Sequence, residues 1–342
     1  MANYIPNNNG RSSSKDFSPT DYSSYFDIDA DLKIKILEKI LELKQETITP
    51  FYENPNCTIH WIPVDDGQIR VLHILPEAPE SIRPIVFLSG WQTMAHQFDD
   101  LDMIIHNRVE FYFVETREKN TSKLNRRKAD LSISQKAKDV QKVIEYFNLQ
   151  SEDFVLFGSC WGATIIFQGL LERTLDAPTI VTFSPMHKIW LNKFILKILV
   201  PILPPFLFGI VLKSLAPLFF LREKAKTQKN RMMITIKEAE NWKWRKCIIA
   251  HRNLNLFGKL HDIEKEVLVF AGTDDRVHKA NDYPRFADEM PNGRFFYFGI
   301  EENEREFAMG ILMYEISKIH ANVSIPQFFK QYEKEIKNIQ QK

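Results

Sequence analysis

Hydrophobic residues follow two alternating patterns along this chain of 342 residues. Short, nearly continuous apolar runs, typical of strands buried on both faces, occupy residues 85–88, 109–114, 154–157, 179–183, 267–271 and 295–298. Helical periodicity occupies the segments between them, near 94–105, 132–147, 161–171 and 280–290, and from about 304 onward. Strands that alternate with helices in this way predict an α/β fold with a doubly wound, mostly parallel sheet.

Two further elements precede this series. Asp29 or Asp31 can cap a helix whose apolar residues recur mostly at intervals of three and four. Residues 57–75 form two alternating β segments around Asp65-Asp66-Gly67, the pattern of a hairpin. Residues 1–27 are rich in asparagine and serine without an apolar core, so we expect a disordered tail rather than a signal peptide or membrane helix.

The alternation stops between residues 186 and 259, where the chain is helical in pattern and strongly apolar from 190 to 221. We therefore expect a core in two parts, residues 28–185 and 260–342, with a helical cap at 186–259. The uncharged stretch 198–212 contains Pro201, Pro204 and Pro205 and is too short to span a bilayer. Its apolar residues fit a buried helix pair, the lining of an acyl pocket, or a face that lies on a membrane. The basic stretch 222–231 fits either anionic lipid or an exposed linker.

Charge and cysteine content narrow the functional classes. Lys plus Arg (45) nearly balance Asp plus Glu (44), which gives a net charge of +1 and no bias toward nucleic acid. Cys57, Cys160 and Cys247 are far apart and lie in no zinc-binding pattern, so we expect a reducing, cytoplasmic location, with membrane association through the cap as an option. The chain contains only 12 glycines, which makes the position of each one informative.

The most specific motif in the chain begins and ends with glycine: Gly158-Ser159-Cys160-Trp161-Gly162. It lies between a predicted strand and a predicted helix. This spacing is that of a nucleophile elbow, in which a strained turn raises the central side chain above the sheet and requires small residues two positions away on either side. Cys160, rather than Ser159, has glycine at both positions, and a helix N-terminus favours its thiolate. The alternative is an inert thiol in an ordinary strand-to-helix turn.

At this motif the chain resembles the α/β-hydrolase family, and the order of elements extends the resemblance from about residue 57 to 319. The resemblance implies an oxyanion hole made by the backbone amides of Trp91 and Trp161. It also implies a catalytic acid after the strand that follows the cap. There the spacing favours Asp275 over Asp274, although both could simply cap the next loop. Glu115–Ser122 occupies the place of the family's Asp-x-Arg-Gly-His-Gly-x-Ser loop and keeps only its Arg and Ser positions.

The family's histidine is missing from the loop after the last strand, where Asn303 stands. His320 follows a helix of about sixteen residues and would lie roughly 24 Å away. His278, three residues after Asp275, is the candidate base, with a surface or structural role as its alternative. A carboxylate such as Glu301 or Glu302 could assist instead, because a thiol needs less activation than a hydroxyl. The remaining histidines follow the oxyanion loop (His96), belong to the cap (His187, His251), or lie on peripheral segments (His60, His73, His106, His261).

Two functions fit these features. The first is hydrolysis or transfer of an acyl group from an apolar ester or thioester through Cys160, with no metal or cofactor. A cysteine at the elbow is similar to that of dienelactone hydrolases and polyhydroxyalkanoate synthases. The second is an α/β-hydrolase homologue that has lost its histidine and binds a ligand or a partner protein. In either case we expect a small apolar or acyl ligand, no nucleic acid, and peripheral contact of the cap with a membrane as an option.

Overall fold

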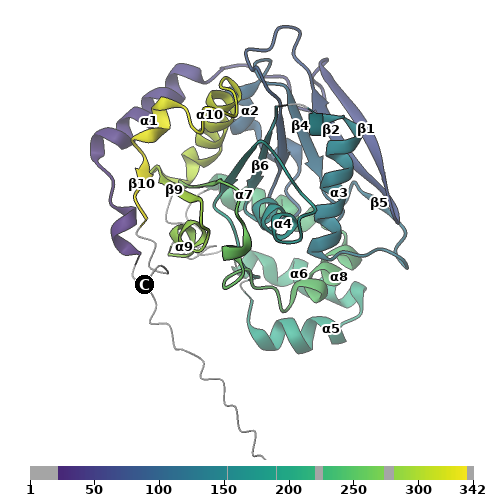
Figure 1. Cartoon of the computed structure of the whole chain (residues 1–342). Helices are drawn as coiled ribbons and strands as arrows, with labels where there is room; N and C mark the ends of the chain where they lie inside the picture. The colour runs from purple at the N-terminus through teal and green to yellow at the C-terminus, as the bar shows by residue number, and fades with distance from the viewer. Residues whose placement is uncertain (1–21, 152, 190, 220–225, 273–280, 337–342) are drawn as a thin grey trace, which may run out of the picture.

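The computed structural model describes residues 22–151, 153–189, 191–219, 226–272 and 281–336 (Figure 1). Its strands are β1 (Cys57–Val64), β2 (Gly67–Ile74), β3 (Ile85–Leu88), β4 (Phe111–Glu115), β5 (Lys123–Leu124), β6 (Val155–Ser159), β7 (Thr179–Phe183), β8 (Val267–Ala271), β9 (Gly293–Tyr297) and β10 (Glu333–Lys334). They form one sheet in the order β1-β2-β4-β3-β6-β7-β8-β9-β10, and β5 pairs with β2. The six strands from β4 to β9 in this order are parallel, whereas β1, β2, β5 and β10 pair antiparallel. This sheet confirms the predicted α/β class.

Helices cover both faces of the sheet. One face carries α1 (Ala30–Leu43), α2 (Asp99–Ile105) and α10 (Arg305–Ser317), and the other carries α3 (Ile133–Tyr146), α4 (Trp161–Leu171) and α9 (Asp282–Asp288). Side chains of β3 alternate between the two cores, with Ile85 and Phe87 on one side and Val86 and Leu88 on the other. The shorter helical segments are η1 (Ser23–Phe26), η2 (Ala95–Gln97), η3 (Leu149–Ser151), η5 (Leu260–Asp262), η6 (Glu302–Glu304) and α11 (Gln327–Lys330). The continuous apolar runs and the helical periodicity thus predicted the strands and helices that build the core.

The N-terminal boundary differs from the expectation in one respect. Residues 1–21 of the expected tail lie outside the described residues, but the remainder of it packs on the core. The buried Tyr22 hydroxyl donates a hydrogen bond to Asp288 Oδ2 at 2.7 Å, and the Phe26 ring meets Tyr297 edge-on. Tyr22 and Phe26 thus bury apolar area on the core, although the tail as a whole is polar in composition. Asp29, of the two candidate caps, accepts a hydrogen bond from the Asp31 amide at the start of α1.

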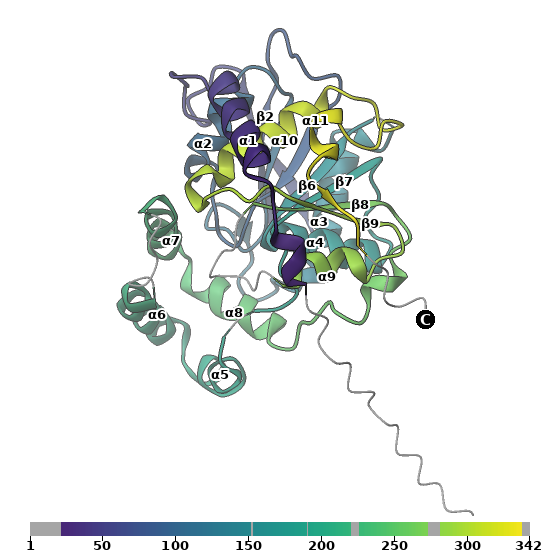
Figure 2. The same ribbon diagram turned by 90° about the vertical axis from the view of Figure 1, so that its left-hand side faces the viewer.

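Between β7 and β8 the chain forms a helical insertion. It comprises the π-helical turn η4 (Ile195–Leu199), α5 (Val200–Ile202), α6 (Pro205–Phe219), α7 (Lys226–Glu238) and α8 (Asn241–His251). Leu203 adopts an extended conformation that ends α5, close to the prolines predicted to break this stretch. Arg245 of α8 donates hydrogen bonds to the Val200 and Leu203 carbonyl oxygens, so α8 is tied to the end of α5. In Figure 2, α5 and α6 lie at the outer edge of the molecule, away from the sheet. None of the helices in the described part of the chain has both the length and the hydrophobicity needed to cross a membrane.

Helix α4 lies unusually close to β3, at the place where β6 enters α4. A Cβ atom on Gly162 would lie 1.9 Å from the Leu88 carbonyl oxygen, and one on Gly158 would lie 2.7 Å from the Ala163 Cα. Both obstacles are backbone atoms, which cannot rotate away as a side chain can. The two glycines are therefore required by the packing of α4 against β3 and by the turn that precedes it.

We predict that Gly162→Ala lowers the free energy of unfolding by about 3 kcal/mol, because relief of the overlap has to move α4 or β3. Gln168→Ala is the control on the same helix, since Gln168 bonds only to the exposed Glu172 in the structure, and its effect should stay within about 0.5 kcal/mol. Urea denaturation of both variants measures the difference. Equal destabilisation by the two substitutions would contradict this account of the α4–β3 contact.

Candidate functional site

The turn from β6 into α4 places Cys160 in a strained conformation. Its backbone has φ 52° and ψ −110°, a region that L-residues rarely occupy and that costs about 1–3 kcal/mol. The Cys160 amide donates a hydrogen bond of 2.9 Å to the Phe183 carbonyl oxygen at the end of β7. Cys160 therefore stands at the carboxyl edge of the parallel strands, where ligands of open α/β sheets bind.

The loop after β3 lies directly beside Cys160. A Cβ atom on Gly90 would be 3.7 Å from the Cys160 Cβ and 3.8 Å from its Sγ, which is ordinary van der Waals contact. The Trp91 ring packs on the Trp161 ring with 4.7 Å between centroids. The two residues expected to supply oxyanion-hole amides thus touch each other, and each directly follows a residue of the Gly90–Cys160 contact. Their role as donors remains a prediction.

Lys119, from the loop after β4, holds this neighbouring loop together. Its buried ammonium donates hydrogen bonds to Ser89 Oγ at 2.8 Å, the Gly90 carbonyl oxygen at 3.1 Å and the Thr93 carbonyl oxygen at 2.8 Å. Burial lowers the pKa of Lys119 to about 8, and the opposing influences include attraction to negative charge on Glu118 and on Cys160. The loop beside Cys160 is therefore held by a buried cation.

Sequence reasoning missed Lys119, although a signal was available. In the stretch Glu115–Ser122, Lys119 occupies the position of the histidine in the family's loop pattern. A lysine in a polar loop gives no sign by itself of being buried. Its three backbone and hydroxyl acceptors come from residues 26 to 30 positions earlier in the chain, so only tertiary contact reveals them.

A second buried group lies under Trp161. The His251 ring meets the Trp161 ring edge-on at 4.8 Å, and the Lys136 ammonium lies 3.2 Å from Cys247 Sγ. Burial, together with repulsion by Lys136, lowers the pKa of His251 to about 2, so this imidazole stays neutral. Its Nδ1 lies 2.6 Å from the Cys247 carbonyl oxygen and must carry the proton, because a carbonyl oxygen only accepts. His251 thus supports Trp161 from inside the protein and is unsuited to act as a base.

The segment after β7 contributes Met186, whose Sδ lies 3.2 Å from Cys160 Sγ. Thr164 of α4 holds Met186 in place through a hydrogen bond of 2.7 Å to its carbonyl oxygen. The next residue, His187, packs on Phe257 and has its Nδ1 3.3 Å from Asp282 Oδ2. Burial lowers the pKa of His187, and the nearby Asp282 opposes that shift. Met186 is therefore the residue of this segment that the structure places against the thiol.

The predicted acid Asp275 and the predicted base His278 both lie in residues 273–280, outside the described residues. Strand β8 and Gly272 precede that segment, and the Ile300 amide donates a hydrogen bond of 2.8 Å to the Gly272 carbonyl oxygen. A Cβ atom on Gly272 would also lie 3.2 Å from the Phe183 ring. Strand β8 therefore ends at the same edge of the sheet as Cys160. The chemical roles of Asp275 and His278 remain predictions.

The loop after β9 contains Asn303, which is exposed within η6. Of the two carboxylates considered there, Glu302 pairs with Arg305 at 3.2 Å, and Glu301 is exposed. His320 lies 3.8 Å from Asp153, which precedes β6 and marks the opposite edge of the sheet. This position of His320 agrees with the large separation from Cys160 that the sequence predicts.

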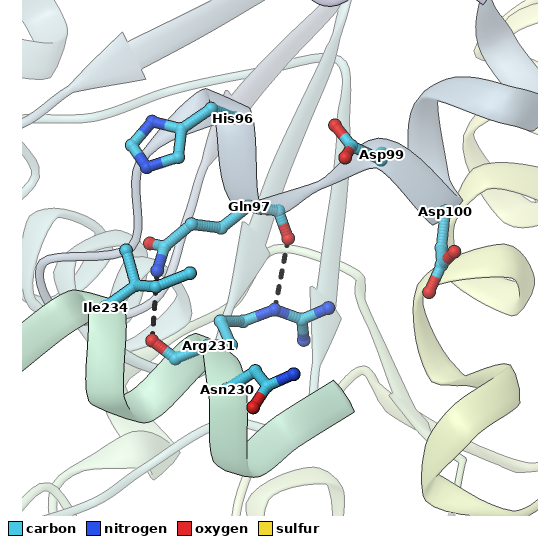
Figure 3. Close-up of a pocket in the computed structure, with 7 residues that line it drawn as sticks. All are labelled: His96, Gln97, Asp99, Asp100, Asn230, Arg231 and Ile234. Atoms are coloured by element: carbon cyan, nitrogen blue, oxygen red, sulfur yellow. Dashed lines mark hydrogen bonds between the residues drawn. The ribbon is translucent and has the colours of Figure 1, made fainter. Parts of the chain in front are cut away.

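A hollow of about 210 Å³ opens between η2, α2 and α7 (Figure 3). Gln97 and Arg231 join its two walls by reciprocal hydrogen bonds, from the Gln97 side-chain amide to the Arg231 carbonyl oxygen at 3.0 Å and from Arg231 Nε to the Gln97 carbonyl oxygen at 3.1 Å. Burial raises the pKa of its two carboxyl groups, Asp99 and Asp100. His96 lines this hollow and faces Glu238 of α7 at 3.3 Å. Since Cys160 is not among the lining residues, the hollow is a seam between the core and the insertion.

Among the described residues, no three histidine, cysteine or acidic side chains come together as a metal site. No protein-family model matches the sequence, and no curated protein matches it either.

Solved structures do match the fold. An esterase from Exiguobacterium antarcticum superimposes with a TM-score of 0.60 and 19% sequence identity, covering 75% of this chain and 99% of the esterase. A hydrolase from Pseudomonas aeruginosa PA01 gives a TM-score of 0.57 and 16% identity, covering 76% of this chain and 98% of its own. A bacterial membrane phospholipase A gives a TM-score of 0.55 and 12% identity, covering 84% and 92%. At these identities the similarity establishes architecture alone: the chain has the α/β-hydrolase fold.

Proposed function

We propose that this protein is an acyl hydrolase or acyltransferase whose nucleophile is Cys160. The observation that carries the proposal is the positive φ of Cys160 at the end of β6. This conformation is held by the hydrogen bond to Phe183 and by two glycines at which a Cβ atom would overlap backbone atoms. Backbone strain of this kind persists only where surrounding packing enforces it, and it is concentrated at functional sites. A buried structural thiol would need no such conformation.

In the proposed reaction the Cys160 thiolate attacks the carbonyl carbon of an ester or thioester. A bond forms between sulfur and carbon, and the carbonyl π electrons move onto oxygen, where the amides of Trp91 and Trp161 stabilise the negative charge. Collapse of this intermediate expels the alkoxide or thiolate, which takes up a proton, and leaves an acyl group on sulfur. Water or another acceptor then attacks the thioester and restores Cys160. Asp275 and His278 are the proposed acid and base.

Lys119 is a positioning residue in this scheme. It binds Ser89, Gly90 and Thr93, so it sets the path of the loop that carries the Trp91 amide. Its charge also interacts with Cys160, so a thiolate there is attracted to the ammonium. One buried group thereby contributes to both the shape and the charge of the site.

The proposed substrate carries an apolar acyl group. Met186 lies against the Cys160 thiol, and Cys160 and Trp91 both pack against the apolar core that contains Trp161. The Trp91 ring also adjoins a small apolar core of the insertion. The names of two structural neighbours, an esterase and a membrane phospholipase A, suit an ester substrate, but they describe those proteins.

A second function has one specific feature in its favour. The loop after β9 offers Asn303, whose amide cannot take up a proton, where the family pattern has histidine. A chain that has lost its base could still bind an acyl ligand or a partner protein at the same edge of the sheet. Covalent chemistry at Cys160 distinguishes the two functions.

We predict that iodoacetamide at pH 7.5 labels Cys160 selectively. Burial raises the pKa of Cys57 to about 11 and that of Cys247 to about 12, so both stay protonated and unreactive at this pH. Peptide mass mapping over time measures the three rates, with a short cysteine peptide as the reference. If Cys160 reacts no faster than the reference peptide, it is not an activated nucleophile.

We further expect an activated ester such as p-nitrophenyl butyrate to give a burst of about one nitrophenolate per chain and an acyl adduct on Cys160. Cys160→Ala should abolish both and lower turnover by at least about 10³-fold. Unchanged turnover in Cys160→Ala would refute the Cys160 mechanism. Saturable binding of an acyl ligand without a burst or adduct would favour the non-catalytic function.

We predict that Lys119→Met lowers kcat by about 10²-fold with little change in KM, because the oxyanion loop loses its three hydrogen bonds. Loss of a positive charge beside the thiolate should also move the pH profile of Cys160 alkylation to higher pH. Lys142→Met is the control for the loss of one lysine charge, since Lys142 of α3 pairs with the exposed carboxylate of Asp65, and it should leave kcat and the pH profile unchanged. Equal pH profiles for wild type and Lys119→Met would limit Lys119 to a structural role.

A further inference from the structure

The outer side of the insertion presents large apolar side chains to solvent. Among the described residues, eighteen large hydrophobic side chains are exposed, and nine of them belong to the 25 residues from 191 to 215. These nine are Leu191, Phe194, Ile198, Leu199, Ile202, Phe206, Leu207, Ile210 and Leu215. Ile202 is 72% exposed, Phe206 66% and Phe194 61%, so most of each of these side chains is in contact with water. We call these nine residues the outer apolar face.

Several residues of the outer apolar face follow a regular helical spacing. Phe194, Ile198, Ile202, Phe206 and Ile210 recur at every fourth position from η4 through α5 into α6. On a helix, residues four apart lie one above the other, so Phe194, Ile198 and Ile202 form one short apolar ridge before the break at Leu203, and Phe206 and Ile210 form a second one on α6. The opposite side of the same segment is buried, with Leu196, Val200 and Phe208 packed on Ile248 of α8. The exposed residues are therefore not a core that lacks its cover, because this segment already has a core of its own.

The charged side chains of the segment that carries the outer apolar face are all positive. Residues 186–221 contain four lysines and no aspartate or glutamate. Lys193, Lys197 and Lys213 are exposed, and within the described part of the chain none of them is paired with a carboxylate. Since the whole chain has a net charge of only +1, this is a local concentration of charge. The binding partner of this face must be both apolar and negatively charged.

A second copy of the chain fits these requirements poorly. A two-fold interface would bring the same face of each copy together and place lysines near lysines, with no acidic residue in 186–221 to pair with them. An anionic lipid surface fits well, because its acyl region receives the apolar ridges while its headgroups meet the lysines at the rim. The position of α5 and α6 at the outer edge of the molecule leaves room for a flat surface to approach (Figure 2).

The segment is suited to lie along such a surface. The break at Leu203 interrupts the helix between α5 and α6, so neither half is long enough to cross the bilayer core. We propose that the outer apolar face, with Lys193, Lys197 and Lys213, is a docking site for the surface of an anionic lipid membrane. This proposal stands independently of the function proposed for Cys160.

Co-sedimentation of the full chain with lipid vesicles tests the proposal. We expect binding to vesicles of phosphatidylcholine containing about one-third phosphatidylserine, weak binding to pure phosphatidylcholine, and loss of affinity as salt is raised. Equal binding to both kinds of vesicle, or binding to neither, would overturn the proposal.

Variants assign the binding to this face. The double substitution Ile202→Glu with Phe206→Glu should abolish sedimentation, because it puts a charge on each apolar ridge. Lys193→Gln, Lys197→Gln and Lys213→Gln should each weaken binding to the anionic vesicles by about fivefold. Leu41→Glu is the matched control, since Leu41 is 76% exposed on α1, outside the insertion, and its variant should bind as the wild type does. Equal loss in Leu41→Glu and in the double variant would overturn the assignment.

Two further measurements separate the alternatives. Thermal unfolding should show that the double variant keeps its fold, because Ile202 and Phe206 are mostly exposed. Sedimentation velocity without lipid should show the same oligomeric state for wild type and double variant. A wild-type dimer that the double variant dissociates would instead make this face an interface between copies and refute the lipid proposal.

Discussion

The contact of α4 with β3 is the constraint on which the candidate site depends. Gly162 allows the helix to begin beside the Leu88 carbonyl oxygen, so the chain must pass from β6 into α4 through a single residue. Cys160 is that residue, and its positive φ is the consequence. The strain persists because the hydrogen bond to Phe183 and the buried strands on both sides leave the turn no other path. The same turn directs the thiol toward the loop after β3 and toward Met186.

Buried lysines connect the insertion to this turn. Lys243 of α8 donates hydrogen bonds to the Lys119 and Ser122 carbonyl oxygens, and Lys119 in turn binds the loop beside Cys160. A buried ammonium is costly unless its protons are all engaged, and backbone oxygens engage them here. The insertion, the loop after β4 and the loop after β3 are therefore one hydrogen-bonded unit. A change at α8 has a physical route to Cys160.

The insertion itself has two apolar sides with different surroundings. Its inner side builds a small core in which Trp91 and Trp244 take part, and its outer side remains in water beside lysines. A globular protein rarely leaves so many large apolar side chains together in solvent unless another surface covers them. Trp91 belongs both to this small core and to the contact with Trp161, so the helices that carry the outer apolar face also adjoin the candidate site.

Short-range pattern was enough to predict the α/β class, the position of nearly every strand and helix, and the glycine-flanked cysteine, because each depends on residues a few positions apart. Apolar runs, helical periodicity and the need for small residues around a sharp turn each involve residues a few positions apart, so the sequence alone shows them. The burial of polar side chains could not be predicted from the sequence. Lys119, Lys136 and Lys243 look like surface residues in the sequence. Carbonyl oxygens from distant segments bind Lys119 and Lys243, and the distant Cys247 thiol contacts Lys136, so their burial depends on tertiary contacts. The sequence was equally uninformative about the apolar stretch at 198–212. A helix with hydrophobic residues on every side has no amphipathic pattern that would show which face is buried. The packing of α8 against one side decided which face of this segment is buried, because burial requires contact with another part of the chain.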